Sequence, residues 1–239
     1  MKRLLADTAN TLLRPLGVGI AKEGFDMDGA VHRLGQHAGG VQSVFDIGAS
    51  NGRWSAMAMP SFPHARFIGI DPLAEREASL KALKAKDPRF DYILCVAGRE
   101  ADGMVELAVG EDLDGSTVGG LGEKRIVPSH SLDAIATMKG LQGPYLLKFD
   151  THGFEVPILA GASAVLSDTA YIIMEVYNFR HTEGTLLFWE MCIHLEKLGF
   201  RCFNLVEPMH RPLDHTLWQM DLFFARHDNP IFASDQFKA

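Results

Sequence analysis

The sequence predicts an α/β protein with a doubly wound sheet of seven mostly parallel strands that ends in an antiparallel hairpin. Three observations lead to this fold class. Apolar, β-branched runs alternate with helix-length segments along most of the 239 residues. The first five runs are continuously apolar, as in parallel strands that are covered on both faces. The last two runs are separated only by the loop 207–219, which indicates an antiparallel pair.

The elements follow from these patterns in chain order. The expected strands are Ser43–Ile47, Arg66–Ile70, Tyr92–Ala97, Tyr145–Phe149, Tyr171–Val176, Arg201–Val206 and Met220–Ala225. The expected helices are Gly52–Met59, Leu73–Ala85, Phe154–Leu166 and Leu186–Leu198. Pro72 is placed to open the second helix, where its missing N–H costs nothing. The region 98–133 interrupts the alternation with a short β-like piece, Met104–Val109, and the Gly-rich DLDGSTVGGLGEKR.

The first 40 residues are expected to form a helical cap on a single globular domain, residues 41–239. Leu5, Ala9, Leu12, Leu13 and Leu16 recur at helical spacing, and polar residues between them interrupt any signal-peptide core. A contact with a membrane or with a second copy of the chain is the alternative use of this helix, so homo-oligomer formation stays open. No run approaches the roughly 20 apolar residues of a membrane span.

The amino-acid composition limits the classes of molecule that the protein is expected to bind. The net charge is −7 and no Lys/Arg run exceeds two residues, whereas a nucleic-acid binder normally carries a basic face. We therefore expect no nucleic-acid partner. Cys95, Cys192 and Cys202 lie far apart in apolar runs without metal-ligand spacing, which favours reduced core cysteines in a cytoplasmic protein.

The stretch VFDIGASNGRW, Val44 to Trp54, predicts a ligand site. Asp46 ends the first strand, Gly48 allows a sharp turn and close approach of a ligand, and Gly52 begins a helix. The spacing Asp-x-Gly-x-x-x-Gly differs from the Gly-x-Gly-x-x-Gly turn that wraps a dinucleotide pyrophosphate. A carboxylate beside the turn suits a ligand that carries an amino group and a sulfonium, which describes S-adenosylmethionine.

A second acid strengthens this interpretation. Asp71 ends the next strand in RFIGIDP, where a carboxylate can accept hydrogen bonds from both ribose hydroxyls. With the terminal hairpin, the pattern describes the Rossmann-like class I methyltransferase fold. The predicted cofactor-binding residues are Asp46, Gly48, Ala49, Asn51, Gly52, Asp71, Pro72, Ala97 and Asp150.

Further along, LLKFDTHGFEVPILAGA places Asp150, His152 and Glu155 after the fourth strand, and IIMEVY ends the fifth with Glu175. With DIGASNG, GIDP, SLDAI and MDLFFARHD, these pieces resemble the FkbM family of S-adenosylmethionine-dependent methyltransferases, from Val44 to His227. The resemblance implies an O-methyltransferase acting on a hydroxyl of a sugar, glycan, lipid-linked saccharide or secondary metabolite. It implies cofactor roles for Asp46, Gly48 and Asp71, and an active-site floor formed by residues 150–155 and Glu175.

His152 is our candidate general base, because an alcohol must lose its proton as the new bond forms and an imidazole exchanges protons near neutral pH. Many family members have Glu or Gln at this position, so the argument for His152 is local. Asp150 or Glu155 would orient the ring or act as the base instead, and a polar turn residue is the alternative reading of His152. Asp150, Glu175 and Asn178 also resemble a Mg²⁺ site of a metal-assisted, catechol-type methyltransferase.

Polar loops supply the candidate acceptor contacts: Ser116, Glu175, Tyr177, Asn178, Arg180 and His181. Such loops suit a small hydroxyl-rich or saccharide acceptor, and plain solvated loops would have the same composition. Two rival functions remain at the level of sequence. One is an NAD(P)-linked oxidoreductase in which Asp71 holds a nicotinamide ribose. The other is a binding or scaffold protein that has kept the fold and lost catalysis.

Overall fold

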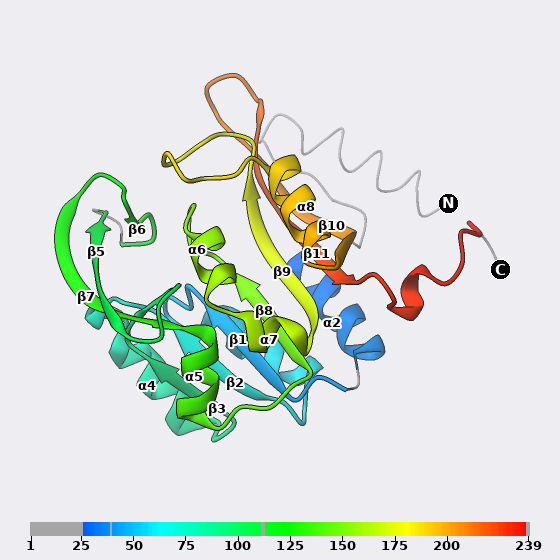
Figure 1. Ribbon diagram of the computed structural model, residues 1–239, viewed down its shortest axis with the longest axis horizontal. Coiled ribbons are helices and arrows are strands. Elements are labelled where there is room, and N and C mark those ends of the chain that lie inside the picture. Colours follow the sequence, from blue (N-terminus) through cyan, green and yellow to red (C-terminus); the bar gives the residue numbers. More distant parts are fainter. Residues whose placement is uncertain (1–25, 39, 111–112, 238–239) are drawn as a thin grey trace, which may run out of the picture.

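The computed structural model describes residues 26–38, 40–110 and 113–237. Within them, the main sheet has seven strands in the spatial order β10-β11-β9-β8-β1-β2-β3 (Figure 1). These strands are β1 (Ser43–Ile47), β2 (Arg66–Ile70), β3 (Phe90–Ile93), β8 (Tyr145–Phe149), β9 (Thr169–Tyr177), β10 (Phe200–His210) and β11 (Leu217–Arg226). Only β11 runs antiparallel to its neighbours in this sheet, which confirms the predicted terminal hairpin.

The strand order places a switch point at the centre of the sheet. The chain moves outward from β1 to β2 and β3, then returns to lay β8 on the other side of β1. The carboxyl ends of the parallel strands on both sides of this point lie at one edge of the sheet, which is where ligands bind in other doubly wound sheets. The predicted site residues of the first and fourth strands follow β1 and β8.

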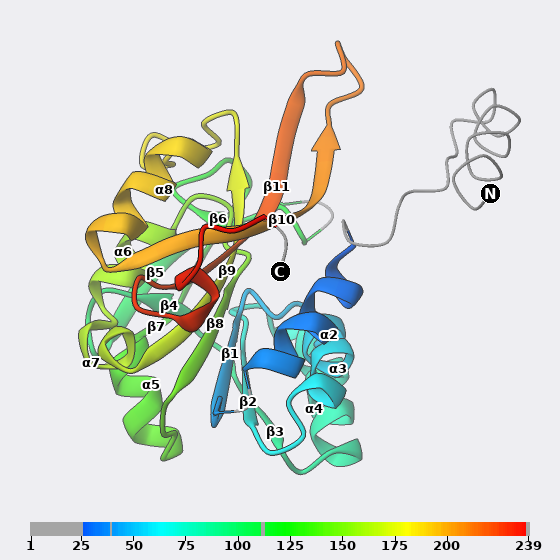
Figure 2. The ribbon, with the colours of Figure 1, turned by 90° about the vertical axis from the view of Figure 1, so that its right-hand side faces the viewer.

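Helices cover both faces of the sheet (Figure 2). On one face lie α2 (Met27–His37), α3 (Arg53–Ala58) and α4 (Glu77–Lys86); on the other lie α5 (Leu132–Lys139), α6 (Glu155–Ala160), α7 (Ser163–Ser167) and α8 (Phe188–Lys197). Val31 and Leu80 pack with Val44 in the first core, while Ile158 and Leu195 pack with opposite-facing strand residues in the second. Burial on both faces explains why the central strands are continuously apolar.

A smaller sheet of four strands stands beside the main one (Figure 1). Its order is β4-β7-β5-β6, with β4 (Val96–Gly98), β5 (Gly103–Val109), β6 (Thr117–Val118) and β7 (Glu123–Ser131). Strands β4 and β7 pair in parallel, Val96 opposite Ser129 and Gly98 opposite Ser131. The region between the third and fourth predicted strands is thus an inserted β-unit rather than a long loop.

Several predicted boundaries were wrong. The expected strand Tyr92–Ala97 is divided between β3 of the main sheet and β4 of the small one, since the chain bends between them. The expected helix Phe154–Leu166 breaks at Gly161, where a Cβ would overlap the carbonyl oxygen of Gly98. The helix expected to begin at Leu73 starts with a 3-10 turn, η3 (Ala74–Arg76), before α4.

At the N-terminus, α2 lies inside the segment expected to form a cap, and the Asp26 carboxylate accepts a hydrogen bond from the N–H of Gly29 at its start. The helix predicted within the first 17 residues lies outside the described part of the chain. In the part that is described, no helix combines the length and the apolar character needed to cross a membrane.

Candidate active site

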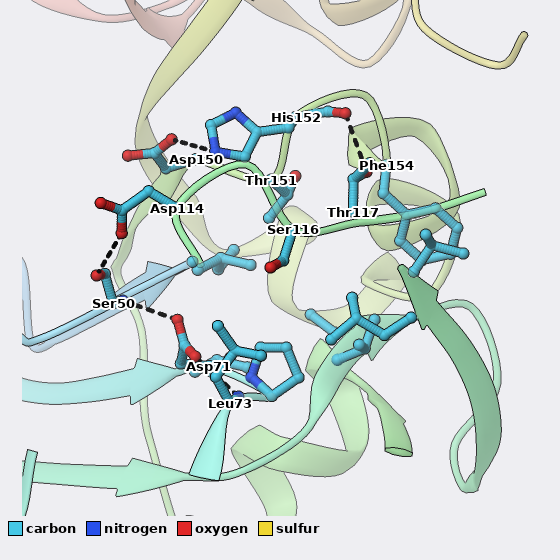
Figure 3. A pocket seen from close by; sticks show the side chains of 18 of the residues that line it. Ser50, Asp71, Leu73, Asp114, Ser116, Thr117, Asp150, Thr151, His152 and Phe154 are labelled. Atoms are coloured by element: carbon cyan, nitrogen blue, oxygen red, sulfur yellow. Dashed lines mark hydrogen bonds and ion pairs between the residues drawn. The ribbon is translucent and has the colours of Figure 1, made fainter. Parts of the chain in front are cut away.

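A cavity of about 340 Å³ lies at the carboxyl ends of β1, β2 and β8, between the main sheet and the small one (Figure 3). Its size is within the range of small-molecule and cofactor sites. Eight of the residues predicted from the sequence line it: Gly48, Asp71, Pro72, Ala97, Ser116, Asp150, His152 and Glu175. The cavity therefore forms where the switch point of the sheet predicts a ligand site.

The two glycines after β1 serve chain packing at this point. Gly48 has φ 82°, and a Cβ there would overlap the carbonyl oxygen of Asp150, so the turns after β1 and β8 touch through backbone atoms. Gly52 has φ 78°, and its Cβ would lie 2.9 Å from Cδ2 of Leu83 on α4. The absence of side chains thus brings strand ends and helices together, and only Gly48 also borders the cavity.

Asp46 is fully buried beneath the cavity and does not line it. Its Oδ2 accepts a hydrogen bond from the hydroxyl of Ser55 on α3 at 2.6 Å. Burial raises the pKa of this carboxyl. The structure thus gives Asp46 a role in fixing α3 against β1, and the predicted contact with a cofactor stays a prediction.

Asp71 faces the cavity from the end of β2 (Figure 3). Its two oxygens accept hydrogen bonds from the backbone N–H groups of Ser50, at 2.8 Å, and Leu73, at 2.9 Å. Burial raises its pKa to about 6. A carboxylate has lone pairs for about four hydrogen bonds, so Asp71 keeps acceptor capacity for a ligand.

An apolar wall continues from Asp71 toward the small sheet. It is formed by Ile70, Leu73, Cys95, Val96, Ala97, Leu107, Leu113, Val118, Phe154 and Ile158. A wall of this kind suits a flat, weakly polar group such as a nucleobase. Asp71 and the wall together match a nucleoside, with hydroxyls on the acid and the base against the apolar side chains.

The segment after β5 covers the cavity from the side of the small sheet. Asp114 forms an ion pair with Arg76 and accepts a hydrogen bond from the hydroxyl of Ser50 at 3.2 Å (Figure 3). Thr117 donates to the carbonyl of His152 at 3.1 Å. Ser116 borders the cavity, but its hydroxyl donates to the carbonyl of Leu113 at 2.7 Å. The two halves of the cavity are therefore joined by polar contacts.

At the other end of the cavity, a buried lysine fixes the ionisation of Asp150. The Nζ of Lys148, a side chain within β8, lies 2.6 Å from Oδ2 of Asp150. Burial opposes the charge on both groups, and the attraction between them offsets this cost. The lysine, with a hydrogen bond from Glu175, holds the pKa of Asp150 well below its ordinary range. Neighbouring carboxylates raise the pKa of Lys148 despite its burial.

Glu175 has the opposite behaviour. Burial and the adjacent Asp150 raise its pKa to about 9. Its Oε1 accepts hydrogen bonds from the hydroxyl of Tyr177, at 2.7 Å, and from the amide of Gln219 on β11. The Tyr177 oxygen is also 2.6 Å from Nδ1 of His152. A continuous polar chain therefore connects Lys148 with His152.

His152 occupies a strained turn after β8, with φ 52°. Its ring borders the cavity, and Nε2 lies 3.8 Å from Oδ1 of Asp150. Glu155, the first residue of α6, is buried outside the cavity wall and accepts hydrogen bonds from the Thr151 hydroxyl and the Gly153 N–H. Glu155 therefore holds the turn that carries His152, and its predicted part in proton transfer stays a prediction.

Ligand atoms of Asp150, His152 and Glu175 lie within 4.8 Å of one another, a spacing that a metal ion could use. However, the Lys148 ammonium contacts Asp150, and Tyr177 hydrogen-bonds both other residues. Asn178, the third ligand of the predicted Mg²⁺ set, donates its amide to the carbonyl of Leu217 and does not line the cavity. The donor set of the Mg²⁺ alternative is therefore not assembled, and the acids present are satisfied by protein groups.

Besides Asn178, three residues predicted for acceptor binding lie beside the cavity rather than on its wall. Tyr177 is buried behind His152. His181 packs edge-on against the Tyr177 ring, with centroids 4.1 Å apart, and burial lowers its pKa. Arg180 turns away to the carbonyl of Thr185 and the carboxylate of Glu190. Among the predicted cofactor residues, Ala49, Asn51 and Gly52 also lie off the wall.

Sequence reasoning missed Lys148, Gln219, Arg76 and Asp114. Lys148 lies in a continuously apolar strand, Arg76 lies on a helix expected to be a plain surface helix, and Asp114 lies in a Gly-rich stretch expected to be a loop. Gln219 reaches Glu175 only because β11 pairs with β9, Gln219 opposite Tyr177. That register follows from the hairpin, which was predicted, but not from the local sequence.

The sheet order, with a reversed strand near one edge, and a cavity with an acid at the end of β2 are the features of a class I methyltransferase fold. Residues 46–202 match the model of the methyltransferase FkbM domain. The chain belongs to the FkbM methyltransferase family and is an S-adenosylmethionine-dependent methyltransferase. This assignment replaces the NAD(P)-linked alternative.

Solved structures give a distant likeness in fold. The chain is similar to 1,6-didemethyltoxoflavin-N1-methyltransferase of Burkholderia thailandensis, with 14% identity, TM-score 0.49, and coverage of 83% of this chain and 77% of that one. It is also similar to magnesium protoporphyrin IX methyltransferase of Synechocystis PCC 6803, with 13% identity, TM-score 0.45, and coverage of 94% and 96%. A search of curated proteins finds no match.

Proposed function

We propose that this methyltransferase transfers its methyl group to a hydroxyl oxygen of a small acceptor, a sugar, glycan or secondary metabolite, with His152 as the general base. The observation that carries the proposal is the imidazole at the cavity wall, with Nε2 3.8 Å from an ionised Asp150. An alcohol is too weak an acid to react without a base, whereas neutral amines carry a free electron pair. A base at this position therefore favours an oxygen acceptor.

The cavity fits the cofactor. Asp71 would accept hydrogen bonds from the ribose hydroxyls, and the apolar wall from Ile70 to Ile158 would enclose the adenine. Gly48, next to the Asp150 backbone, would border the amino-acid part. Asp150 stays ionised beside Lys148 and supplies negative charge near a cationic ligand. These residues come from three strand ends whose spacing is fixed by the sheet.

When bound, S-adenosylmethionine supplies a methyl carbon whose bond to sulfur breaks, leaving the electron pair on sulfur, as the bond to the acceptor oxygen forms. The protein has to align the acceptor and remove its proton, and alignment accounts for most of the rate in such displacements. His152 takes up, at Nε2, the proton that the hydroxyl of the methyl acceptor loses. Asp150 then faces the resulting imidazolium and stabilises its charge.

The first test is titration calorimetry of the protein with S-adenosylhomocysteine and, separately, with NADH. We expect micromolar binding of S-adenosylhomocysteine and none of NADH. Asp71→Ala should weaken binding by about 1.5–3 kcal/mol, the usual value of hydrogen bonds to a charged acceptor. Unchanged affinity in Asp71→Ala would refute the ribose assignment, and binding of NADH alone would refute the placement of the cofactor.

Acceptor class is tested by incubating the protein with radiolabelled S-adenosylmethionine and panels of sugars, phenols and amines. Transfer to alcohols that is lost in His152→Gln would support the proposal, and transfer to amines alone would contradict it. The reaction is run with EDTA and with Mg²⁺, and a requirement for Mg²⁺ would favour the metal-assisted alternative.

A cytoplasmic location, supported by the three free cysteines, forms part of the same proposal.

A further inference from the structure

The Glu175 carboxyl group has one oxygen that accepts and one that holds a proton. Oε1 receives two donors, the Tyr177 hydroxyl and the Gln219 amide, so it has no room for a proton of its own. Lys148 keeps Asp150 ionised, so Glu175 is the donor in the hydrogen bond between the two carboxyl groups, and the remaining oxygen is the one with room for the proton. Glu175 is therefore a neutral acid that donates to Asp150 and accepts from Tyr177.

This arrangement uses the only proton of the Tyr177 hydroxyl. The side chain is buried, which keeps the phenol protonated, and its proton points to Glu175 at 2.7 Å. The Tyr177 oxygen can therefore only accept a hydrogen bond from the second neighbour, Nδ1 of His152, at 2.6 Å. It follows that Nδ1 carries the hydrogen in the neutral imidazole.

The other ring nitrogen is then left with a free electron pair. Nε2 lies 3.8 Å from Oδ1 of Asp150, which is an acceptor and has no hydrogen to donate. Free imidazole side chains prefer the opposite tautomer, with the hydrogen on Nε2. The protein environment thus reverses the ordinary preference of this ring.

We propose that Tyr177 and Glu175, with Gln219, are positioning residues that fix His152 in the Nδ1–H tautomer, so that Nε2 is the nitrogen that receives the acceptor proton. The proposal rests on the proposed function only in its last step, the use of Nε2 as the base. After the proton arrives, Nδ1–H still donates to Tyr177 and Nε2–H faces the Asp150 carboxylate. No change in the positions of the neighbouring side chains is required.

The backbone explains why the three groups meet. Glu175 and Tyr177 are two residues apart on β9, so their side chains lie on the same face of the sheet. Gln219 is paired with Tyr177 across the β9–β11 ladder. His152 lies in the turn after β8, the other neighbour of β9. The tautomer is therefore set by three adjacent strands of a rigid sheet.

The decisive measurement is the ¹⁵N spectrum of the His152 imidazole, with its signals assigned by their loss in His152→Gln. We expect a protonated Nδ1 and an unprotonated Nε2 in the native protein above the pH at which the ring is charged. Tyr177→Phe should move the hydrogen toward Nε2. Tyr171→Phe, which removes a hydroxyl bonded to Asn229 elsewhere, is the matched control and should leave the signals unchanged. An Nε2–H ring in the native protein, or an unchanged ring in Tyr177→Phe, would overturn the proposal.

Two substitutions of Glu175 test the direction of the hydrogen bonds that run from His152 through Tyr177 to Glu175. Glu175→Gln keeps a neutral carbonyl oxygen for Tyr177 and an N–H donor for Asp150, so the Nδ1–H tautomer should persist. Glu175→Leu removes the oxygen that accepts the hydrogen bond of the Tyr177 hydroxyl. That hydroxyl is then free to donate to Nδ1 of His152, which should invert the tautomer. Loss of the tautomer in Glu175→Gln would show that an ionised Glu175 is needed, which contradicts the proposal.

These spectra need neither cofactor nor acceptor, so they separate the two claims. If S-adenosylhomocysteine fails to bind while the spectra behave as expected, the proposed function fails and the tautomer assignment stands. With an acceptor in hand, Tyr177→Phe should lower kcat on the order of 10²-fold or more, as for a lost general base, with little change in KM. A native kcat in Tyr177→Phe would show that the tautomer has no part in the reaction.

Discussion

At the scale of single residues, Gly48 connects the two central turns of the site. Its positive φ and its contact with the Asp150 carbonyl leave no room for a side chain. We predict that Gly48→Ala destabilises the protein by at least about 2 kcal/mol, from left-handed strain and the backbone overlap together. Chemical denaturation measures this effect.

Gly103→Ala is the matched control, because a Cβ at Gly103 would meet no atom within 4 Å. It should change stability by much less. A Gly48→Ala protein as stable as the control would show that the turns after β1 and β8 can separate at little cost. In that case the close approach seen here would not define the site.

At the scale of secondary-structure elements, the SLDAI stretch has a structural use. Ser131 caps α5 by accepting a hydrogen bond from the Ala134 N–H. Asp133 accepts from two N–H groups at the start of α7, Ala164 at 3.0 Å and Val165 at 2.8 Å. One carboxylate thus joins two helices on the same face of the sheet.

We predict that Asp133→Ala lowers the free energy of unfolding by about 1–3 kcal/mol, because two N–H groups lose a charged acceptor. Its affinity for S-adenosylhomocysteine should match that of the native protein, since Asp133 does not line the cavity. Calorimetric titration and denaturation separate the two effects, with the exposed Asp235→Ala as the control. A large loss of affinity in a folded Asp133→Ala protein would contradict this prediction.

Some secondary-structure elements could be predicted from the sequence pattern, and others could not. The parallel strands and the hairpin were predictable, since burial on both faces demands continuous apolar runs. Strand β7 was missed because its residues alternate between exposed and half-buried and include Pro128, a pattern shared with loops. The bend between β3 and β4 left no mark in the apolar run 92–97.

The residues of the candidate site likewise include some that could be predicted from the sequence and some whose roles could not. Asp71, Asp150 and Glu175 were predictable, because acids at the ends of parallel strands gather at one edge of the sheet. Glu175 and Tyr177 were named as acceptor contacts; the structure shows them hydrogen-bonded to each other, with Glu175 on the cavity wall and Tyr177 behind His152. Such roles depend on which atoms meet after packing, and residue type and spacing do not determine that.

At the scale of the whole molecule, buried acids make stability depend on pH. Burial raises the pKa of Asp71 to about 6, of Asp221 to about 7 and of Glu175 to about 9. The folded protein therefore retains protons that the unfolded chain releases above about pH 4. Between about pH 4 and pH 9 the folded state therefore binds more protons than the unfolded chain, and its stability falls as pH rises. Asp150, with a lowered pKa, acts oppositely only at pH values below that window.

We predict a smaller free energy of unfolding at pH 8 than at pH 5, measured by denaturant titration. Glu175→Gln cannot lose a proton, so its stability should fall less between these pH values. Glu183→Gln, on the exposed loop after β9, serves as the control and should behave like the native protein. A decline in Glu175→Gln as steep as the native one would show that Glu175 is already ionised at pH 5.

The parallel pairing of β4 with β7 holds the two ends of the inserted small sheet side by side. The chain leaves the main sheet before Val96 and returns after Ser131, and these two points are neighbours in a parallel ladder. Whatever lies between them can lengthen, shorten or be exchanged without moving the central strands. Since this stretch supplies one wall of the cavity, changes within it would reshape that wall while the strand ends that carry Asp71 and Asp150 keep their places.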